Sequence, residues 1–302
     1  MEDLKQHIKD LSKADVHSHL HLAGSQERFR ERYADANINF PKTFNGLNGM
    51  INFIYDHLNA VMLTKTDVVN FMEIGIESAI DDNVKLLEAS VDISLARFFN
   101  NSIDNVIEAV KVLIEKYKSQ IDFRPDIGVN KDLDIEKVYS DGVRCVESGV
   151  FNGIDFYGQE ADKDLNPFIK FYDISRGFGL KTKVHIGEFS DYHSIDNTIK
   201  LLQPQEIQHG IRAINSQKTM DLILENNIRL NLCPTSNIAL GAITDLKNHP
   251  IRTLYDYGID LTINTDDLIL FNATVTDEFS NLLEQNIFSF EELDKIRNNA
   301  FN

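Results

Sequence analysis

Eight short runs of mostly apolar residues recur along the chain, each followed by a turn and a longer helix-like segment. This alternation constrains the fold more than any other feature, because short apolar runs bounded by turns are typical of buried strands. Strands joined by helices lie parallel, since parallel neighbours need a crossover connection. The sequence therefore predicts an α/β fold, a closed (β/α)8 TIM barrel. The predicted strands are Ala14–Val16, Lys85–Val91, Phe123–Val129, Gly153–Tyr157, Lys181–Ile186, Glu206–His209, Arg229–Leu232 and Asp260–Asn264.

The segments between these runs have the periodicity of amphipathic helices. In Ser102–Lys118 the apolar residues recur at i, i+3, i+4 and i+7, and Asp67–Ile80 repeats the pattern. The connection after the first strand, from about Gly24 to Ile80, is longer than the others and contains several helical stretches. We expect these extra helices to lie over the barrel mouth as a partial lid.

The length and composition of the chain suit one barrel. A chain of 302 residues is long for an ordinary domain but normal for a closed α/β barrel. Hydrophobic residues make up 42% of it, which is enough for a large core. No repeat, low-complexity tract or Pro/Gly-rich linker interrupts the pattern. We expect residues 1–302 to form a single domain.

The charge of the chain limits its partners. The formal net charge is −17, and an acidic chain repels a nucleic-acid backbone. We therefore expect a small molecule as the partner and no nucleic acid. No apolar run approaches the ~18 residues that span a bilayer, so no membrane is expected either. The start lacks the pattern of a signal peptide, and Cys145 and Cys233 are too few for a disulfide framework. These features favour a cytoplasmic protein.

Histidines and carboxylates occur where the predicted strands end. In an α/β barrel the chemistry lies at the carboxyl ends of the strands, so these side chains should meet at one mouth. Each motif alone has an ordinary structural explanation, but their joint placement predicts a metal-activated hydrolase. The residues concerned are His17, His19, His185, Glu188, His209, Asp266 and Asp267.

The first histidines are two residues apart, so on a strand both rings project from the same face. That spacing allows His17 and His19 to bind one ion. An isolated H-x-H pair is more often a pair of surface or turn histidines than a metal site. His21 follows His19 at the same spacing of two residues. The spacing alone therefore leaves the choice of pair open.

The paired aspartates close the last predicted strand. Asp266 and Asp267 cost free energy side by side unless a cation or protons are present. A turn or a helix cap is the ordinary explanation, but histidines at other strand ends favour a metal ligand and a substrate contact. Three neutral histidines and one aspartate leave a divalent ion with net positive charge, which lowers the pKa of bound water toward neutrality. Zinc suits these nitrogen and oxygen ligands best, although iron, manganese or nickel are compatible with them.

With these residues in order, the chain resembles the adenosine deaminase family of metal-dependent aminohydrolases. The resemblance runs from about Lys13 to Phe271. Its strongest parts are Glu206–Ala213, Leu232–Asn237 and Thr262–Asp267, which are moderately specific singly and highly specific in series. It implies a (β/α)8 barrel, one divalent ion per chain and hydrolytic deamination of a 6-aminopurine such as adenosine, deoxyadenosine or adenine.

The resemblance also implies roles for individual residues. His17, His19, His185 and Asp266 would bind the metal. Glu188 would protonate the ring nitrogen beside the carbon under attack, because attack on an aromatic carbon requires that nitrogen to gain a proton. His209 would orient and deprotonate the attacking water. Asp267 would help to hold the water and the purine, and Gly158, in Gly153–Glu160, would donate its backbone N–H to the purine.

One departure from the family concerns the first strand. The family continues its H-x-H directly into Leu-Asp-Gly-Ser, whose aspartate contacts the ribose. Alignment from Lys13 makes His17 and His19 the ligands, whereas alignment from Ser25 makes His19 and His21 the ligands; the strand start favours the first. Either way Ala23 stands where the ribose-contacting acid would be, which leaves the choice between nucleoside and free base open.

Two rival functions follow from the same residues. Asp15–His19 also resembles the opening of barrel metallophosphoesterases, which recruit two or three metals. The second rival is a purine-binding relative without catalytic activity, although the intact Glu188, His209 and Asp267 argue against it. The other zinc deaminase architecture, with H-x-E and P-C-x-x-C, is absent from the sequence. The metal and the oligomeric state are left open.

Overall fold

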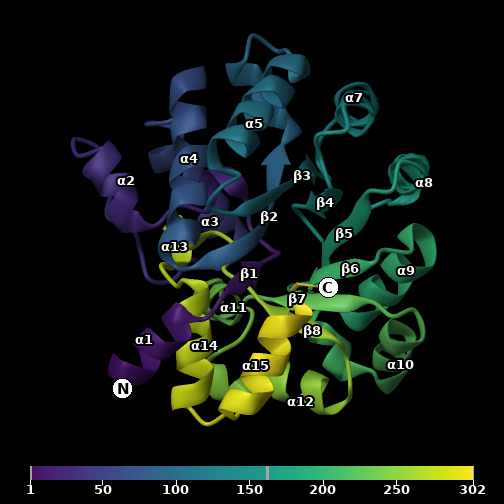
Figure 1. The fold of residues 1–302 in the computed structure, drawn as a ribbon. Helices are drawn as coiled ribbons and strands as arrows, with labels where there is room; N and C mark the ends of the chain where they lie inside the picture. Colours follow the sequence, from purple (N-terminus) through teal and green to yellow (C-terminus); the bar gives the residue numbers. More distant parts are fainter. Residues whose placement is uncertain (1, 161–162, 302) are drawn as a thin grey trace.

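Eight parallel strands form a barrel in the computed structural model, which describes residues 2–160 and 163–301. The strands are neighbours in chain order, from β1 to β8, and Figure 1 shows helices surrounding them on all sides. The predicted (β/α)8 barrel is confirmed. The strands are β1 (Lys13–Asp15), β2 (Val84–Asp92), β3 (Asp122–Asn130), β4 (Gly153–Tyr157), β5 (Lys181–Ile186), β6 (Glu206–His209), β7 (Arg229–Leu232) and β8 (Leu261–Ile263).

Four of these strands, β4 to β7, have the predicted bounds. The strand β1 ends at Asp15, one residue earlier than predicted. The backbone N–H of Val16 donates to the Asn264 side chain (2.9 Å) instead of continuing the ladder with β2. His17 and His19 therefore lie just beyond the strand, where Ser18 and His19 each form a single bridge.

The barrel closes between the segments that follow β1 and β8. The Asp266 N–H donates to the His17 carbonyl (3.0 Å), and the Ser18 hydroxyl donates to the Asp266 carbonyl (3.1 Å). These bonds join residues about 250 positions apart in the chain. Closure therefore fixes the first histidine pair against the last aspartate pair.

Helices fill the connections, as the alternation predicts. Polar caps mark their starts: Ser102 caps the predicted helix α5, and Thr64 forms a capping box with Asp67 at α4. The α-helices are α1 (Glu2–Asp10), α2 (Gln26–Arg32), α3 (Gly46–Phe53), α4 (Lys65–Asp81), α5 (Ile103–Tyr117), α6 (Ile135–Lys137), α7 (Val143–Glu147), α8 (Ile169–Gly177), α9 (Tyr192–Leu202), α10 (Gln217–Glu225), α11 (Pro234–Ala239), α12 (Ile251–Asp256), α13 (Leu268–Phe271), α14 (Val275–Glu284) and α15 (Phe290–Asn299). Shorter turns include the 3₁₀ helix η1 (Leu20–Leu22) and the π-helix η2 (Ile54–Leu58).

The long connection after β1 contains α2, α3, η2 and α4, which are the predicted extra helices. Apolar side chains of α3 and η2, including Met50 and Ile54, line the same cavity as His19 and Asp266. This part of the chain therefore covers the barrel mouth, as expected of a lid.

Charged side chains fill part of the barrel interior. Lys183 of β5 is fully buried, and its ammonium contacts Glu88 of β2 (2.7 Å) and Asp126 of β3 (2.6 Å). Burying a charge is costly unless partners compensate it, and this lysine has two.

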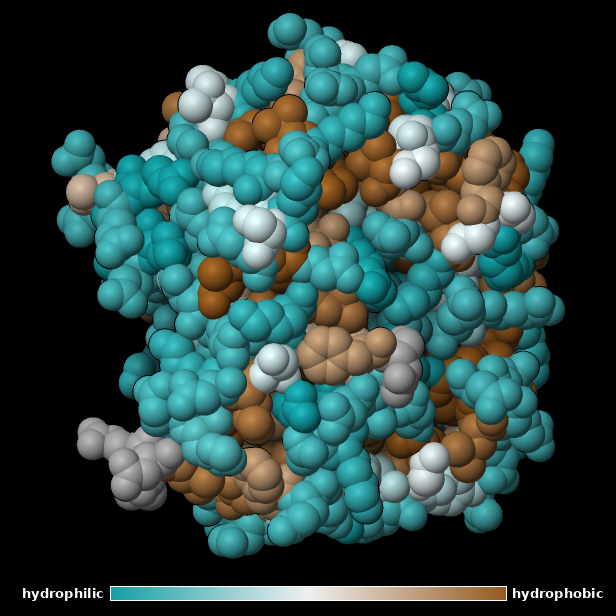
Figure 2. Space-filling model, viewed as in Figure 1, coloured by the Kyte–Doolittle hydropathy of each residue, from teal (hydrophilic) through white to brown (hydrophobic). Residues whose placement is uncertain are grey.

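On the outside, hydrophilic side chains cover most of the face in Figure 2, broken by smaller hydrophobic patches. Within residues 2–160 and 163–301, we find no helix with the length and apolarity that a bilayer crossing requires.

Close packing of α4 on η1 supports the segment that carries His19. A Cβ atom at Gly75 would lie 2.5 Å from the Leu20 carbonyl oxygen and 3.1 Å from Ala23 Cβ. Helical positions normally favour alanine over glycine by about 1 kcal/mol. Here glycine is required because the two backbones approach so closely.

We expect Gly75→Ala to lower the free energy of unfolding by about 1–3 kcal/mol, since overpacking displaces the Leu20 backbone. Gly177→Ala is the matched control, because Gly177 ends α8 and has open space around it. The free energy of unfolding of this variant should equal that of the wild type or exceed it slightly. Urea unfolding of both variants measures the difference. A rise in stability of the Gly75 variant would contradict the packing described here.

Candidate active site

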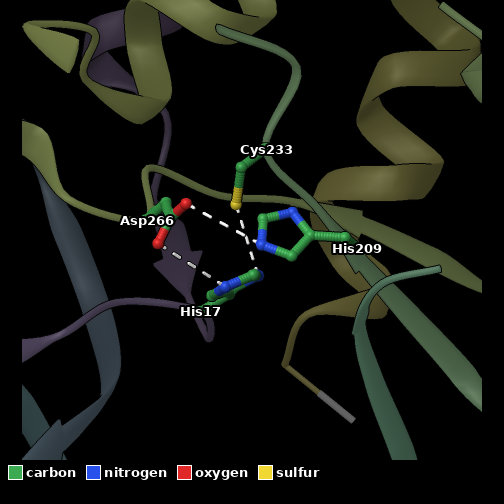
Figure 3. A group of neighbouring side chains, drawn as sticks. All are labelled: His17, His209, Cys233 and Asp266. Carbon is green, nitrogen blue, oxygen red and sulfur yellow. Dashed lines mark hydrogen bonds and ion pairs between the residues drawn. The ribbon is translucent and has the colours of Figure 1, made fainter. Parts of the chain in front are cut away.

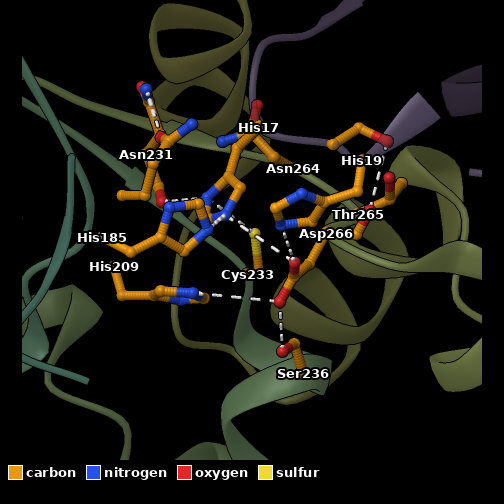
Figure 4. Close-up of polar contacts among 12 residues, drawn as sticks. His17, His19, His185, His209, Asn231, Cys233, Ser236, Asn264, Thr265 and Asp266 are labelled. Carbon is orange, nitrogen blue, oxygen red and sulfur yellow. Dashed lines mark hydrogen bonds and ion pairs between the residues drawn. The ribbon is translucent and has the colours of Figure 1, made fainter. Parts of the chain in front are cut away.

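Three histidines and one aspartate converge at the carboxyl ends of the strands. One ligand atom from each of His17, His19, His185 and Asp266 lies within 4.8 Å of the others. All four are buried, and Figure 4 shows their side chains turned toward one another. His21 belongs to neither of the clusters that could hold a metal among residues 2–160 and 163–301. The geometry therefore groups His17 with His19.

In His17 and His185, the ring nitrogen Nδ1, which faces away from the cluster, already has a hydrogen-bond partner. His17 Nδ1 meets the Asn231 carbonyl (2.9 Å), and His185 Nδ1 meets a carboxylate oxygen of Asp155 (3.1 Å). Both partners are acceptors, so each ring carries its hydrogen on Nδ1 and turns an Nε2 lone pair inward. The two Nε2 atoms are 3.1 Å apart. Two lone pairs at that distance repel unless a cation lies beside them, so the donor set fits a metal ion.

The remaining members of the cluster are held in the same way. Ser90 contacts His19 Nδ1 (2.9 Å), which leaves His19 Nε2 facing Asp266 Oδ1 at 3.6 Å. The Ser236 hydroxyl donates to Asp266 Oδ2 (2.6 Å). Burial lowers the pKa of His19 to about 3, and burial with the neighbouring histidines lowers the pKa of His17 well below its usual value. Neutral imidazoles are the form that binds metal.

Unusual backbone conformations place two of these side chains. His209 has φ +67° and Asp266 has φ +59°, a left-handed region that few residues other than glycine adopt. The Gly210 N–H donates to the Ile186 carbonyl (3.1 Å), and the barrel closure holds Asp266. Such strain persists where surrounding bonds enforce it, and it gathers at functional sites.

A second group of candidate ligands contains Cys233 with His17, His209 and Asp266 (Figure 3). The Cys233 sulfur lies 3.3 Å from His17 Nδ1, the nitrogen that also meets Asn231, whereas Asp266 faces Nε2. Burial raises the pKa of this thiol well above its usual value. A protonated thiol behind the ring is a poor ligand, so the three-histidine set fits an ion better.

The carboxyl of Glu188 lies beside this cluster and is buried. Burial, followed by the charges of Asp266 and Glu160, raises its pKa well above the usual value. One oxygen accepts a hydrogen bond from the Asn237 amide (2.6 Å), and the other lies 3.6 Å from His209 Nε2. A carboxyl that stays protonated near neutral pH can act as a proton donor.

A chain of hydrogen bonds determines how His209 is oriented. The Ile251 N–H donates to His249 Nδ1 (3.1 Å), so His249 donates from Nε2 to the side-chain oxygen Oδ1 of Asn237 (3.0 Å). The Asn237 amide nitrogen must then face Glu188 and His209 Nδ1 (3.1 Å). His209 Nδ1 accepts this bond, which puts the ring hydrogen on Nε2.

The cluster opens into a cavity of about 350 Å³. Asp267 lines it, and its buried Oδ1 has no hydrogen-bond partner within residues 2–160 and 163–301. Burial and the charges of Asp266 and Glu188 raise the pKa of Asp267 well above its usual value. Gly158 lines the cavity with φ +97°, and a Cβ there would lie 2.6 Å from Asn130 Oδ1, so only glycine fits. Except for His17, which is fully buried behind the other ligands, the predicted site residues line one cavity of a size suited to a small molecule.

The wall of the cavity near η1 differs from the sequence-based expectation. Ala23 is buried and lines a separate small cavity with Gly75. His21 lines the main cavity. It follows His19 by two residues, just as the aspartate of the family motif follows the second histidine by two residues. The position expected to contact a sugar is therefore occupied by an imidazole rather than by Ala23.

Several residues of the site were missed by the sequence reasoning. Ser236 and Asn237 lie in the motif Leu232–Asn237, whose polar residues were a signal for such roles. Asp155 points into the barrel from the alternating strand β4, which was a weaker signal. Ser90 and Asn231 carry no sequence pattern that links them to the histidines. The missed residues are Ser90, Asp155, Glu160, Asn231, Ser236, Asn237 and His249.

This barrel, with histidines and an aspartate at its strand ends beside a buried carboxylic acid, defines a hydrolase of the metal-dependent amidohydrolase class. The family model described as "Adenosine deaminase" matches residues 15–302. A Treponema pallidum protein assigned as an adenosine/adenine deaminase is 32% identical over 92% of this chain and 93% of its own length. An adenosine deaminase of Clostridium acetobutylicum is 25% identical, over 99% and 94%. The chain belongs to the adenosine deaminase family and is a hydrolytic deaminase.

Solved structures share the fold. The adenine deaminase of Arthrobacter aurescens superposes with a TM-score of 0.81 at 21% identity, covering 95% of this chain and 92% of that one. An amidohydrolase of Burkholderia ambifaria with bound Zn has a TM-score of 0.81 at 18% identity, covering 98% and 86%. Arabidopsis ADAL complexed with IMP has a TM-score of 0.82 at 19% identity, covering 98% and 92%.

We expect Asn237→Ala to lower kcat by about ten- to hundredfold, because it removes two hydrogen bonds, each contributing about 1 kcal/mol, from Glu188 and His209. Asn197→Ala on the exposed side of α9 is the control and should leave activity unchanged. Steady-state kinetics of ammonia release measure both. Equal activity of the two variants would show that the amide does not organise the site.

Proposed function

We propose that this protein hydrolyses the 6-amino group of adenosine, or of a close 6-aminopurine such as deoxyadenosine or adenine, to the 6-oxo purine with release of ammonia. The single observation that carries the proposal is the inward-facing set of Nε2 atoms next to a buried carboxyl. The nitrogens of His17 and His185 are 3.1 Å apart, and Glu188 opens into the same cavity. Such a site can activate water and donate a proton to a substrate in the same cavity.

We propose that His17, His19, His185 and Asp266 bind one divalent ion, most favourably Zn²⁺. The Zn bound in the Burkholderia ambifaria amidohydrolase supports this choice of metal. When bound, the ion lowers the pKa of a coordinated water and so supplies a nucleophile near neutral pH. The outer bonds of His17, His19 and His185 keep their Nε2 lone pairs aimed at one point.

Glu188 is the proposed proton donor to the purine ring. Attack at the amino-bearing carbon pushes electrons onto the adjacent ring nitrogen, which must be protonated as charge develops. The raised pKa of Glu188 keeps the carboxyl protonated until then, and the bond from Asn237 aims it. Its place in the cavity wall gives it access to the ring.

His209 is proposed to orient the attacking water through Nε2. The bonds from His249 through Asn237 favour a hydrogen on Nε2, so the neutral ring donates to the oxygen and stabilises negative charge there. The base role implied by the resemblance requires a free Nε2. The ring hydrogen of His209 would then lie on Nδ1, where it would face the hydrogens of the Asn237 amide. The hydrogen bond from Asn237 to His209 Nδ1 therefore opposes the base role.

Asp267 and Gly158 are proposed to hold the purine. The Asp267 carboxyl, whose Oδ1 has no hydrogen-bond partner among the residues that the structure describes, has a raised pKa and can donate to a ring nitrogen. The close packing at Gly158 brings its backbone against the ligand. IMP in Arabidopsis ADAL supports a purine as the occupant. The imidazole of His21 lines the same cavity where the family motif has an acid, so a free base and a nucleoside are both substrates to test.

The rival metallophosphoesterase would need two or three metals, whereas the described cluster offers the ligands of a single ion. A non-catalytic relative would have no use for a buried carboxyl aimed at the substrate. The expectations of one domain over residues 1–302 and of a cytoplasmic location stay predictions.

We expect metal-loaded protein to release ammonia from at least one of adenosine, deoxyadenosine and adenine, with one bound ion per chain. Chelated protein is the control and should lose activity until Zn²⁺ is restored. An ammonia assay with metal analysis on the same sample measures both. No ammonia from any of these compounds would refute the substrate assignment, and two or three ions per chain would favour the phosphoesterase.

We expect Glu188→Gln to lower kcat by about 10²- to 10⁴-fold while the bound metal stays unchanged, because the amide cannot donate the required proton. Glu225→Gln, at the exposed end of α10, is the matched control and should be fully active. Unchanged activity of Glu188→Gln would disprove the acid role.

A further inference from the structure

The turn that carries Glu188 is held by a single carboxylate from another loop. Glu160, which follows β4, accepts hydrogen bonds from successive backbone N–H groups between β5 and α9. The donors to Glu160 are the N–H groups of Gly187 (2.9 Å), Glu188 (3.2 Å), Phe189 (3.2 Å) and Ser190 (2.9 Å), and the Ser190 hydroxyl (2.6 Å). Five donors meeting one acidic side chain is more than an ordinary helix cap provides.

The backbone of the turn is shaped to receive an anion. Gly187 has φ +78°, and a Cβ there would lie 2.4 Å from Ile195 Cδ1, so this residue bends the chain where a side chain would not fit. Successive N–H groups in such a bend form a concavity that attracts negative charge. Glu160 fills this concavity, which is otherwise typical of a site for a bound anion.

A second side chain holds the other end of the same segment. The Lys131 ammonium, buried after β3, donates to the His185 carbonyl (2.9 Å). The strand end is thus held at its carbonyl by Lys131 and at the following N–H groups by Glu160. Glu188 is part of this held segment. Its N–H is bound by Glu160, and its carboxyl lines the cavity with Oε2 3.6 Å from His209 Nε2.

We propose that Glu160 is a positioning residue that aims Glu188 at the substrate by binding the turn Gly187–Ser190. This inference rests on the proposed function, because it gives Glu160 a role only through proton donation. A carboxylate is required at this position, since it accepts on both oxygens. Glutamine would turn an N–H₂ group against N–H donors. Alanine would remove the acceptor of the Glu188, Phe189 and Ser190 N–H groups and would leave the Gly187 N–H only the Ser190 hydroxyl (3.2 Å).

We expect Glu160→Gln to lower kcat at least about tenfold while KM changes less than about threefold, because the turn shifts the proton donor but not the purine contacts. The metal content should equal that of the wild type. Glu147→Gln, at the exposed end of α7, is the matched control and should be fully active. Wild-type kcat in Glu160→Gln would overturn the proposal.

A double variant separates positioning from general support of the fold. If Glu160 acts through Glu188, then Glu160→Gln/Glu188→Gln should have a kcat within about threefold of Glu188→Gln alone. Multiplied losses in the double variant would show that Glu160 acts by another route and would overturn the proposal. Glu160→Asp, which keeps the charge, should recover part of the activity lost in Glu160→Gln.

Amide hydrogen exchange gives a readout that does not depend on turnover. In Glu160→Gln the amides of residues 187–190 should exchange faster than in the wild type, while those of β6 and β7 stay protected. Unchanged exchange in the turn would overturn the proposal. Wild-type protein without deaminase activity would instead refute the proposed function, so the two failures can be told apart.

Discussion

The closure of the barrel between the segments after β1 and β8 is the constraint on which the site depends. Two hydrogen bonds join Asp266 to His17 and Ser18, although these residues lie about 250 positions apart. Closure forces Asp266 into a left-handed backbone conformation and turns its carboxylate toward the histidines. Without that contact, the ligands from the first and last strands would belong to separate edges of an open sheet.

Burial makes the neutral forms of the site residues the stable ones. It lowers the pKa of His17 and His209 and raises the pKa of Glu188 and Asp267. Neutral imidazoles expose lone pairs to a cation, and a protonated carboxyl retains a proton to donate. The same low-dielectric environment therefore prepares the residues for both halves of a hydrolytic deamination.

Much of the fold was predictable because its signals are local. Runs of apolar residues predicted the bounds of β4 to β7 correctly. The helical periodicity predicted each end of α5 to within one residue. The strand β1 differs because the Asn264 side chain, remote in sequence, takes the N–H of Val16. Predicted site residues meet because parallel strands bring their carboxyl ends to one mouth. The supporting contacts of Ser90, Asn231 and Asn237 depend on strand register, which no local pattern specifies.

The sequence by itself determined the barrel, the family and the kinds of side chain available for catalysis, since these follow from periodicity and from residue types at strand ends. Only the tertiary structure decided that His17 and His19 face Asp266 while His21 lines the cavity wall. It also brought Glu160 onto the turn of Glu188. The physical reason is that ring orientation and hydrogen-bond partners depend on distances between segments far apart in the chain. Those distances exist only once the barrel has closed.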